Sequence, residues 1–236
     1  MIKCDEPMRK ISDRIFRNKK QLYTVNLVPG HRVYGEKLKK VEITEPNKPV
    51  SKTVEYREWD PNRSKLAAAI LNGLQSIPIK NSSIILYLGA SAGTTPSHIS
   101  DIVGTKGIVY SVEFAERVFR IFINLAKKRT NLIPILSDAR KPEKYYWVEE
   151  VDVLYVDIAQ PDEIEISIRN ARKFLKKNGY LMIAIKSRSI DVTKNPKKVY
   201  KQARKKLEQA NFDVIDIIDL KPYEKDHAMI VAVKQF

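Results

Sequence analysis

Short apolar runs alternate with longer amphipathic stretches along most of this chain. Each run has the length of a buried strand, and the runs cover residues 84–88, 108–112, 133–136, 153–156, 180–185, 214–218 and 229–233. Between most of them, apolar residues recur at helical spacing, near residues 96–103, 115–129, 162–176 and 196–210. Buried strands that alternate with helices predict an α/β fold with a mostly parallel sheet covered on both faces.

The last two apolar runs break this alternation. Only residues 219–228 separate them, which is too short for a helix that crosses over to a parallel strand. We therefore expect these two strands to pair antiparallel. A seven-stranded sheet that ends in an antiparallel pair is typical of Rossmann-like S-adenosylmethionine (SAM) methyltransferases, and the pattern favours this fold class.

The first 55 residues follow a different pattern, which predicts a small N-terminal β domain. Its β-prone stretches cover residues 22–28, 33–34 and 41–43, and residues 45–52, with two prolines, are expected to form a linker or turn. A helix is expected over residues 64–74, where apolar residues return to helical spacing. We therefore assign residues 1–55 to the β domain and residues 56–236 to the methyltransferase-like domain.

The charge balance suggests a polyanionic partner. Lys and Arg number 43 among 236 residues, against 28 Asp and Glu, so the net charge is +15. A globular protein this basic commonly binds nucleic acid, although heavily charged surfaces also occur in heat-adapted proteins. The basic stretch 194–206 is therefore a candidate for phosphate contacts, with a simple solvated helix face as the alternative.

Cysteine and histidine usage excludes several kinds of site. Cys4 is the single cysteine, so an intramolecular disulfide and a thiolate metal cage are both excluded. The histidines, His31, His98 and His227, are too scattered to indicate a metal site, and His98 is expected on the surface. No apolar run approaches the ~20 residues that cross a bilayer, and no signal-peptide pattern is visible, so we expect a soluble intracellular protein without membrane contact.

A turn of small residues, 89–95, directly follows the first of the seven apolar runs. Gly89 and Gly93 permit close approach of the backbone to a ligand, and Ala90 leaves space beside them. Thr95 is expected to cap a helix whose backbone amides could receive a carboxylate. A dinucleotide-binding loop would carry glycine at the positions of Ser91 and Thr94, so the turn favours a more compact cofactor, unless it merely connects two elements.

Acidic residues end the next three predicted strands in succession. Glu113, Asp138 and Asp157 close the second, third and fourth strands. The first of these carboxylates is placed to accept hydrogen bonds from ribose hydroxyls, and the second from an adenine amino group. One such residue would be an ordinary cap or surface carboxylate, but carboxyl ends of parallel strands meet at one edge. The series therefore predicts a single nucleoside-binding crevice.

Several longer motifs resemble the archaeal form of the fibrillarin family. They are YLGASAGTT at 87–95, DIAQP at 157–161, IKSRSID at 185–191 and KDHA at 225–228, and the similarity runs from about residue 56 to the C-terminus. The resemblance implies SAM as cofactor and 2′-O-methylation of ribosomal and transfer RNA at sites chosen by box C/D guide RNA. It also implies a set of cofactor-binding residues: Thr94, Thr95, Glu113, Phe114, Asp138, Ala139, Asp157, Ile158, Ala159 and Gln160.

Ribose methyltransferases of related fold use a Lys-Asp-Lys-Glu set, and the resemblance places its counterparts at Lys65, Asp157, Lys186 and His227. Our hypothesis is that Lys186 accepts the proton of the sugar hydroxyl and that Asp157 orients the two ammonium groups. His227 stands where the set has a glutamate, so its role stays open. The alternative for both lysines is a charged side chain held in solvent.

The resemblance further implies assembly with guide RNA, a Nop-family scaffold protein and a kink-turn-binding ribosomal-type protein, in the cytoplasm of an archaeal cell. No RNA-reading module is visible in the sequence, which agrees with target choice by a guide. Three alternatives remain open: a methyltransferase acting on protein side chains, a non-catalytic RNA-binding assembly subunit and, on weaker grounds, a nicotinamide oxidoreductase.

Overall fold

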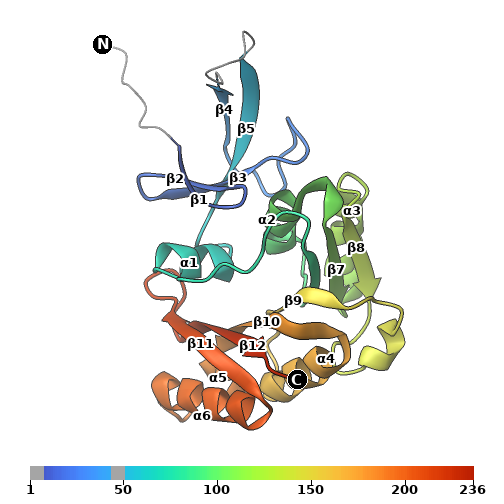
Figure 1. Ribbon diagram of the computed structural model, residues 1–236, viewed down its shortest axis with the longest axis vertical. Helices are drawn as coiled ribbons and strands as arrows, with labels where there is room; N and C mark the ends of the chain where they lie inside the picture. Colours follow the sequence, from blue (N-terminus) through green and yellow to red (C-terminus); the bar gives the residue numbers. More distant parts are fainter. Residues whose placement is uncertain (1–7, 44–50) are drawn as a thin grey trace.

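A computed structural model describes residues 8–43 and 51–236, and it contains two sheets, one above the other in Figure 1. The larger sheet has seven strands in the order β11-β12-β10-β9-β6-β7-β8. In chain order they are β6 (Ile84–Leu88), β7 (Ile108–Glu113), β8 (Leu132–Leu136), β9 (Val151–Val156), β10 (Leu175–Lys186), β11 (Phe212–Asp219) and β12 (His227–Lys234). The pairs among β6–β10 are parallel, and β12 lies antiparallel between β10 and β11. The expected mostly parallel sheet and the expected antiparallel pairing of the last two strands are both confirmed.

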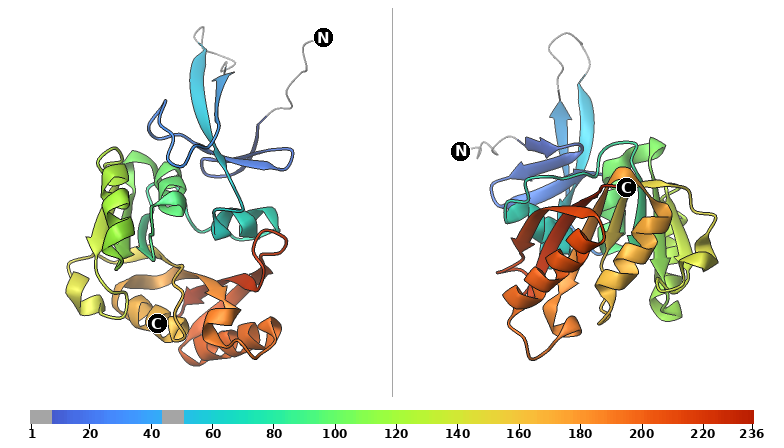
Figure 2. Two further views of the ribbon diagram at one scale, coloured as in Figure 1. Left: turned by 180° about the vertical axis from the view of Figure 1, so that it is seen from behind. Right: turned by 60° about the horizontal axis from the view of Figure 1, so that its bottom comes forward.

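Helices cover both faces of the seven-stranded sheet, as the front and back views show (Figures 1 and 2). One face packs against α1 (Lys65–Leu71), α2 (Thr94–Val103) and α3 (Glu116–Ala126). The other packs against α4 (Glu163–Phe174) and α6 (Pro196–Gln209). Shorter turns are η1 (Gly104–Lys106), η2 (Pro142–Tyr145) and α5 (Ser187–Ile190). None of the described helices is long and apolar enough to cross a membrane.

Alternation along each strand produces two apolar cores. In β6, Ile85 and Tyr87 belong to the core beneath α1–α3, whereas Leu86 and Leu88 belong to the core beneath α4 and α6. Successive side chains of a strand point to opposite faces, so a strand buried on both sides must be apolar throughout. This is why the apolar runs mark the strands of this sheet.

The N-terminal sheet is antiparallel and has the order β1-β2-β3-β5-β4. Its strands are β1 (Arg9–Ser12), β2 (Ile15–Asn18), β3 (Gln21–Val25), β4 (Leu38–Ile43) and β5 (Lys52–Trp59). The expected strand at 33–34 is wrong, because the backbone amides of Val33 and Tyr34 instead donate to the Glu36 carboxylate in a turn. The linker expected at 45–52 lies largely outside the described residues. β5 runs across the boundary expected between residues 55 and 56, since its pairing with β3 continues to Trp59.

A buried carboxylate joins the two sheets. Asp101 of α2 accepts a hydrogen bond from Arg57 of β5 at 3.0 Å and from Arg129 at 2.6 Å. It also accepts from the Thr24 hydroxyl at 2.8 Å and from the Leu27 backbone amide at 2.9 Å. Both guanidinium groups and the carboxylate are fully buried. The N-terminal sheet therefore fixes the position of α2, which begins at the small-residue turn.

His98 is part of the same buried contact and not a surface residue as expected, since its side chain is 0% exposed. Its ring stacks on Trp59 with centroids 4.9 Å apart, and its two nitrogens lie 2.9 Å from Thr24 Oγ1 and 2.8 Å from the Tyr34 hydroxyl. Thr24 donates its hydrogen to Asp101, so it must accept from Nδ1–H of the neutral imidazole. Burial and two neighbouring arginines hold the pKa of His98 far below its usual value.

Candidate active site

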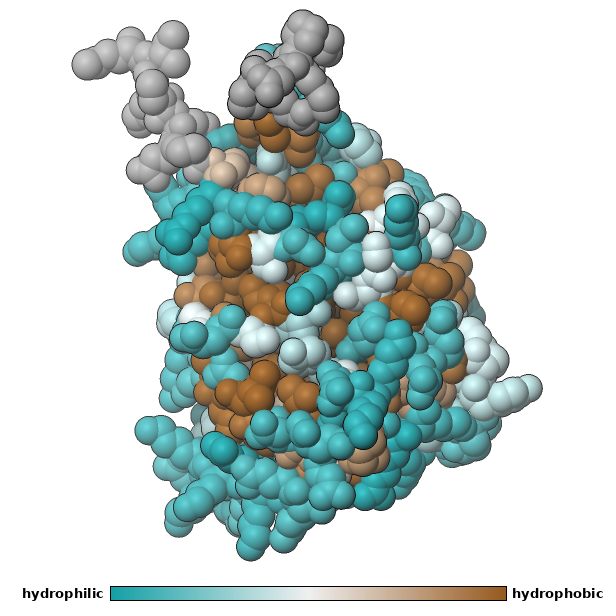
Figure 3. All heavy atoms as spheres, viewed as in Figure 1, coloured by the Kyte–Doolittle hydropathy of each residue, from teal (hydrophilic) through white to brown (hydrophobic). Residues whose placement is uncertain are grey.

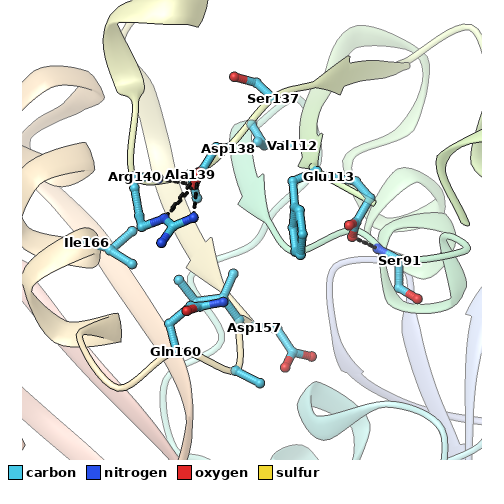
Figure 4. Close-up of a pocket in the computed structure, with 14 residues that line it drawn as sticks. Ser91, Val112, Glu113, Ser137, Asp138, Ala139, Arg140, Asp157, Gln160 and Ile166 are labelled. Carbon is cyan, nitrogen blue, oxygen red and sulfur yellow. Dashed lines mark hydrogen bonds and ion pairs between the residues drawn. The ribbon is translucent and has the colours of Figure 1, made fainter. Parts of the chain in front are cut away.

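A pocket of about 250 Å³ lies at the carboxyl edge of the sheet and is lined by residues at or just after the ends of β6, β7, β8 and β9. β6 and β9 are paired at the centre of this group. These strands are neighbours, but the strands that follow them, β7 and β10, lie on opposite sides, so the edge opens there. The residues that line the pocket include nine of the predicted cofactor set: Gly89, Glu113, Phe114, Asp138, Ala139, Asp157, Ile158, Ala159 and Gln160. Figure 4 shows Glu113 on one side of the pocket and Asp138 on the other.

The remaining predicted residues, Ala90, Gly93, Thr94 and Thr95, lie in the adjoining turn and are not among the lining residues. Thr95 is not the helix cap: α2 begins at Thr94, and Gly93, with φ of 92°, precedes it in the left-handed conformation. A Cβ atom at Gly93 would lie 2.6 Å from the Phe122 and Leu125 side chains, which is why only glycine fits there. Thr95 instead donates to the Ser64 hydroxyl at 3.0 Å.

Glu113 holds the turn in place. Its carboxylate accepts a hydrogen bond from the backbone amide of Ser91 at 2.8 Å (Figure 4). It also accepts one from the backbone amide of Ala115 at 2.8 Å. Each oxygen keeps a second lone pair, so the carboxylate still has capacity for ligand hydroxyls. The next residue, Phe114, leaves 66% of its surface exposed although it is a large apolar side chain. An exposed ring in the wall of a pocket suits a flat aromatic ligand.

Asp138 is bound by Arg140, a lining residue that sequence reasoning missed. The guanidinium donates to both carboxylate oxygens at 2.8 to 3.1 Å, and the Arg140 backbone amide donates at 2.9 Å. These contacts hold the pKa of Asp138 below its usual value. Aspartate side chains often accept a hydrogen bond from the backbone amide two residues later, which forms a turn. The spacing of Asp138 and Arg140 was the one local signal that could have identified the arginine.

Lys65 and Asp157 form an ion pair beside the pocket. Lys65 Nζ lies 2.7 Å from Asp157 Oδ1, and the two side chains are 22% and 21% exposed. Lys65 is the first residue of α1, which Ser64 caps by accepting the Ala67 amide. Because Thr95 also bonds to Ser64, the starts of α1 and α2 are tied together at this edge of the sheet.

The strand order brings the other two predicted catalytic residues to the same edge. Lys186 ends β10 and is exposed, and its Cα partner in the antiparallel ladder is His227, the first residue of β12. β10 neighbours β9, which leads into Asp157, and α1 packs against β12. His227 Nδ1 lies 2.7 Å from the Lys225 carbonyl oxygen, so Nδ1 carries a hydrogen and a lone pair remains on Nε2 of the neutral ring.

Comparison with known proteins agrees with this geometry. The family model described as Fibrillarin matches residues 9–236, which includes the N-terminal sheet. The chain belongs to the fibrillarin family. It is 59% identical over 212 residues to the fibrillarin-like rRNA/tRNA 2′-O-methyltransferase of Sulfolobus acidocaldarius, covering 89% of this chain and 87% of that one.

Two solved fibrillarin structures resemble this one over nearly its whole length. Aeropyrum pernix fibrillarin, in complex with natively bound S-adenosyl-L-methionine, is 46% identical with a TM-score of 0.80, covering 96% of this chain and 99% of that one. A fibrillarin/Nop5p complex contains a chain 39% identical with a TM-score of 0.83, covering 97% of this chain and 100% of that one. The fibrillarin fold thus places the strand-end acids of this family member at one pocket.

Proposed function

We propose that this fibrillarin-family chain transfers a methyl group from SAM to ribose 2′-hydroxyls of ribosomal and transfer RNA, as the catalytic subunit of a box C/D guide ribonucleoprotein. The observation that carries the proposal is the Lys65–Asp157 ion pair at the rim of a pocket lined by Glu113 and Asp138. The pocket supplies carboxylates for a nucleoside, and the ion pair supplies charges for a reacting hydroxyl.

The residues of the pocket fit SAM. The turn that follows Gly89 would receive the amino-acid part, Glu113 would accept the ribose hydroxyls, and the exposed Phe114 ring would stack on the adenine. Asp138 is placed for the adenine amino group, and it would share its carboxylate with Arg140. The cofactor supplies a methyl group activated by a sulfonium.

The side chains at the rim can move the proton of the sugar hydroxyl. A ribose 2′-hydroxyl is a weak acid, so a base must accept its proton as the oxygen attacks, and the amine form of Lys186 is our candidate. Asp157, fixed by Lys65 at 2.7 Å, would orient the lysines and limit their motion. His227, with Nδ1 committed to the Lys225 carbonyl, presents a lone pair on Nε2 that could accept a hydrogen bond from Lys186 or the sugar.

The partners belong to the same proposal. A Nop-family scaffold is supported by the fibrillarin/Nop5p complex of a similar chain, and guide RNA and a kink-turn-binding protein follow from the family resemblance. The lower part of the face in Figure 3, over α5 and α6, is hydrophilic. Lys197, Lys198, Lys201 and Lys205 of α6 are exposed and could contact phosphates. We also place the assembly in the archaeal cytoplasm.

A reconstitution tests the function. Labelled SAM, guide RNA, target RNA, the two partner proteins and this chain should yield methylated riboses at guide-specified positions, and the isolated chain should bind SAM but methylate RNA poorly. Omitting each component in turn shows whether methylation depends on it. Label on protein side chains instead of RNA would favour a protein methyltransferase, and failure of SAM to bind in calorimetry would favour a non-catalytic subunit.

Gly89 provides a sharp test of the cofactor pocket. A Cβ atom at Gly89 would lie 2.2 Å from the Asp157 carbonyl oxygen, and its φ is +87°. Gly89→Ala should therefore move the Asp157 loop and weaken SAM binding by about tenfold or more, a loss of roughly 1.4 kcal/mol. Isothermal calorimetry measures this loss directly.

Gly73→Ala is the matched control. Gly73 has φ of +96° but no atom within 4 Å of the added Cβ, so it bears the same backbone strain without the clash. We expect Gly73→Ala to cost about 1 kcal/mol of stability and to leave SAM affinity unchanged. Equal SAM affinities of Gly89→Ala and Gly73→Ala would contradict the close approach of the turn to the Asp157 loop.

A further inference from the structure

One buried acid next to the catalytic groups has no assigned role. Glu163 is the first residue of α4 and follows the loop that begins at Asp157. Its side chain is 0% exposed, and neither carboxyl oxygen has a partner of good hydrogen-bond geometry among the described residues, although the Lys186 backbone amide lies close enough to interact with the group. An ionised carboxylate in such a place is very unfavourable, so the group must be a neutral acid.

The charged groups around Glu163 are those of the proposed active site. Burial and the charge of Asp157 raise the pKa of Glu163 to about 9, whereas the Lys186 backbone amide and the charge of Lys65 oppose the shift. These groups come from three elements: the loop after β9, the end of β10 and the start of α1. His227 of β12 lies across the ladder from Lys186.

Glu165, two residues along α4, shows what an ordinary acid does in this helix. Its carboxylate pairs with Lys206 of α6 at the surface, where both side chains are about half exposed. Burial next to the catalytic groups is therefore particular to Glu163 and is not a general property of the acidic first turn of α4.

We propose that Glu163 is a positioning residue of the active site, held uncharged beside Asp157 so that Lys65 and Lys186 face one carboxylate charge instead of two. This inference rests on the proposed function. A second negative charge would stabilise the ammonium form of Lys186 and would compete with Asp157 for Lys65. Ionisation of Glu163 would therefore keep Lys186 in the ammonium form, which cannot accept a proton, and would also weaken the Lys65–Asp157 ion pair.

The pH dependence of methylation tests this role in the reconstituted assembly. The wild-type rate should fall as pH rises through about 9, where Glu163 ionises. Glu163→Gln keeps the shape and stays neutral, so its rate near neutral pH should lie within about threefold of wild type and should not show that fall. Glu165→Gln is the control and should follow the wild-type profile.

Two results would overturn the proposal. One is a Glu163→Gln profile that overlies wild type at alkaline pH. The other is a loss of tenfold or more in the Glu163→Gln rate near neutral pH with normal SAM binding, which would mean that the reaction needs the proton or the charge of the glutamate.

Thermal unfolding of the free chain tests the protonation state without RNA or activity. Between pH 4.5 and about 9 the folded chain keeps a proton on Glu163 that the unfolded chain releases, so wild type loses stability as pH rises through this window. Glu163→Gln carries no such proton, and its Tm advantage over wild type should grow steadily across the window. A constant Tm difference would overturn the proposal. A growing difference without any RNA methylation would instead count against the proposed function alone.

Discussion

Substitution of Lys186 by methionine should lower the single-turnover rate of RNA methylation by about 10²- to 10⁴-fold, the range expected when a general base is removed. The side chain is exposed at the end of β10, and the backbone of this strand end is held by its pairing with His227 of β12. The change should therefore leave the fold and SAM affinity intact. Single-turnover assays on the reconstituted assembly, with calorimetry of the same variant, measure both quantities.

Lys177→Met is the control for this variant. Lys177 is exposed near the amino end of the same strand, far along β10 from the pocket. The Lys177→Met variant loses the same charge from the same strand and should retain the full rate of RNA methylation. Full activity of Lys186→Met, or an equal loss in both variants, would remove Lys186 from its role as base.

Substitution of Asp101 by asparagine should cost about 3–5 kcal/mol of unfolding free energy, because it leaves the buried Arg129 guanidinium without its ion-pair partner and leaves Arg57 with Glu36 alone. Arg57 and Arg129 lie 3.0 and 2.6 Å from this carboxylate and are fully buried. For a chain of this size the loss corresponds to a fall in Tm of roughly 6–20 °C. Differential scanning calorimetry of the free chain provides the measurement.

Glu208→Gln breaks a surface ion pair instead. Glu208 lies 2.7 Å from Arg204 in α6, with both side chains about half exposed, so its loss should change stability by less than about 1 kcal/mol. A Tm for Asp101→Asn that matches this control would show that the buried arginines find other partners or water.

The sequence pattern was sufficient to predict the seven-stranded sheet because strands buried on both faces must be apolar throughout. It also predicted the strand-end acids, since Glu113, Asp138 and Asp157 end parallel strands that meet at one edge. The start of α2 was misplaced by two residues, since the cap is Gly93 and not Thr95. Thr95 has the side chain of a good cap, but the helix already begins at Thr94, after Gly93 in the left-handed conformation, where a Cβ atom would clash with Phe122 and Leu125.

The remaining features depend on contacts between residues distant in the chain. His98 occupies the first turns of a helix that looks solvent-facing in isolation, and it is buried only because the N-terminal sheet covers α2. Glu163 resembles any acidic residue at a helix start, yet it is buried beside the residues of the proposed active site. The spacing of residues along the chain does not show that the N-terminal sheet covers His98, nor which groups surround Glu163.

The contact between Asp101 and the N-terminal sheet also determines how the chain can be divided. Removing the first five strands would strip Arg57, Thr24 and the Leu27 amide from the carboxylate and open the ring of His98 to water. The helix so disturbed is the one that begins at the small-residue turn. A shortened protein consisting of the larger sheet alone would therefore be a poor starting point for engineering, and exchange of segments between relatives should keep both sheets from the same parent.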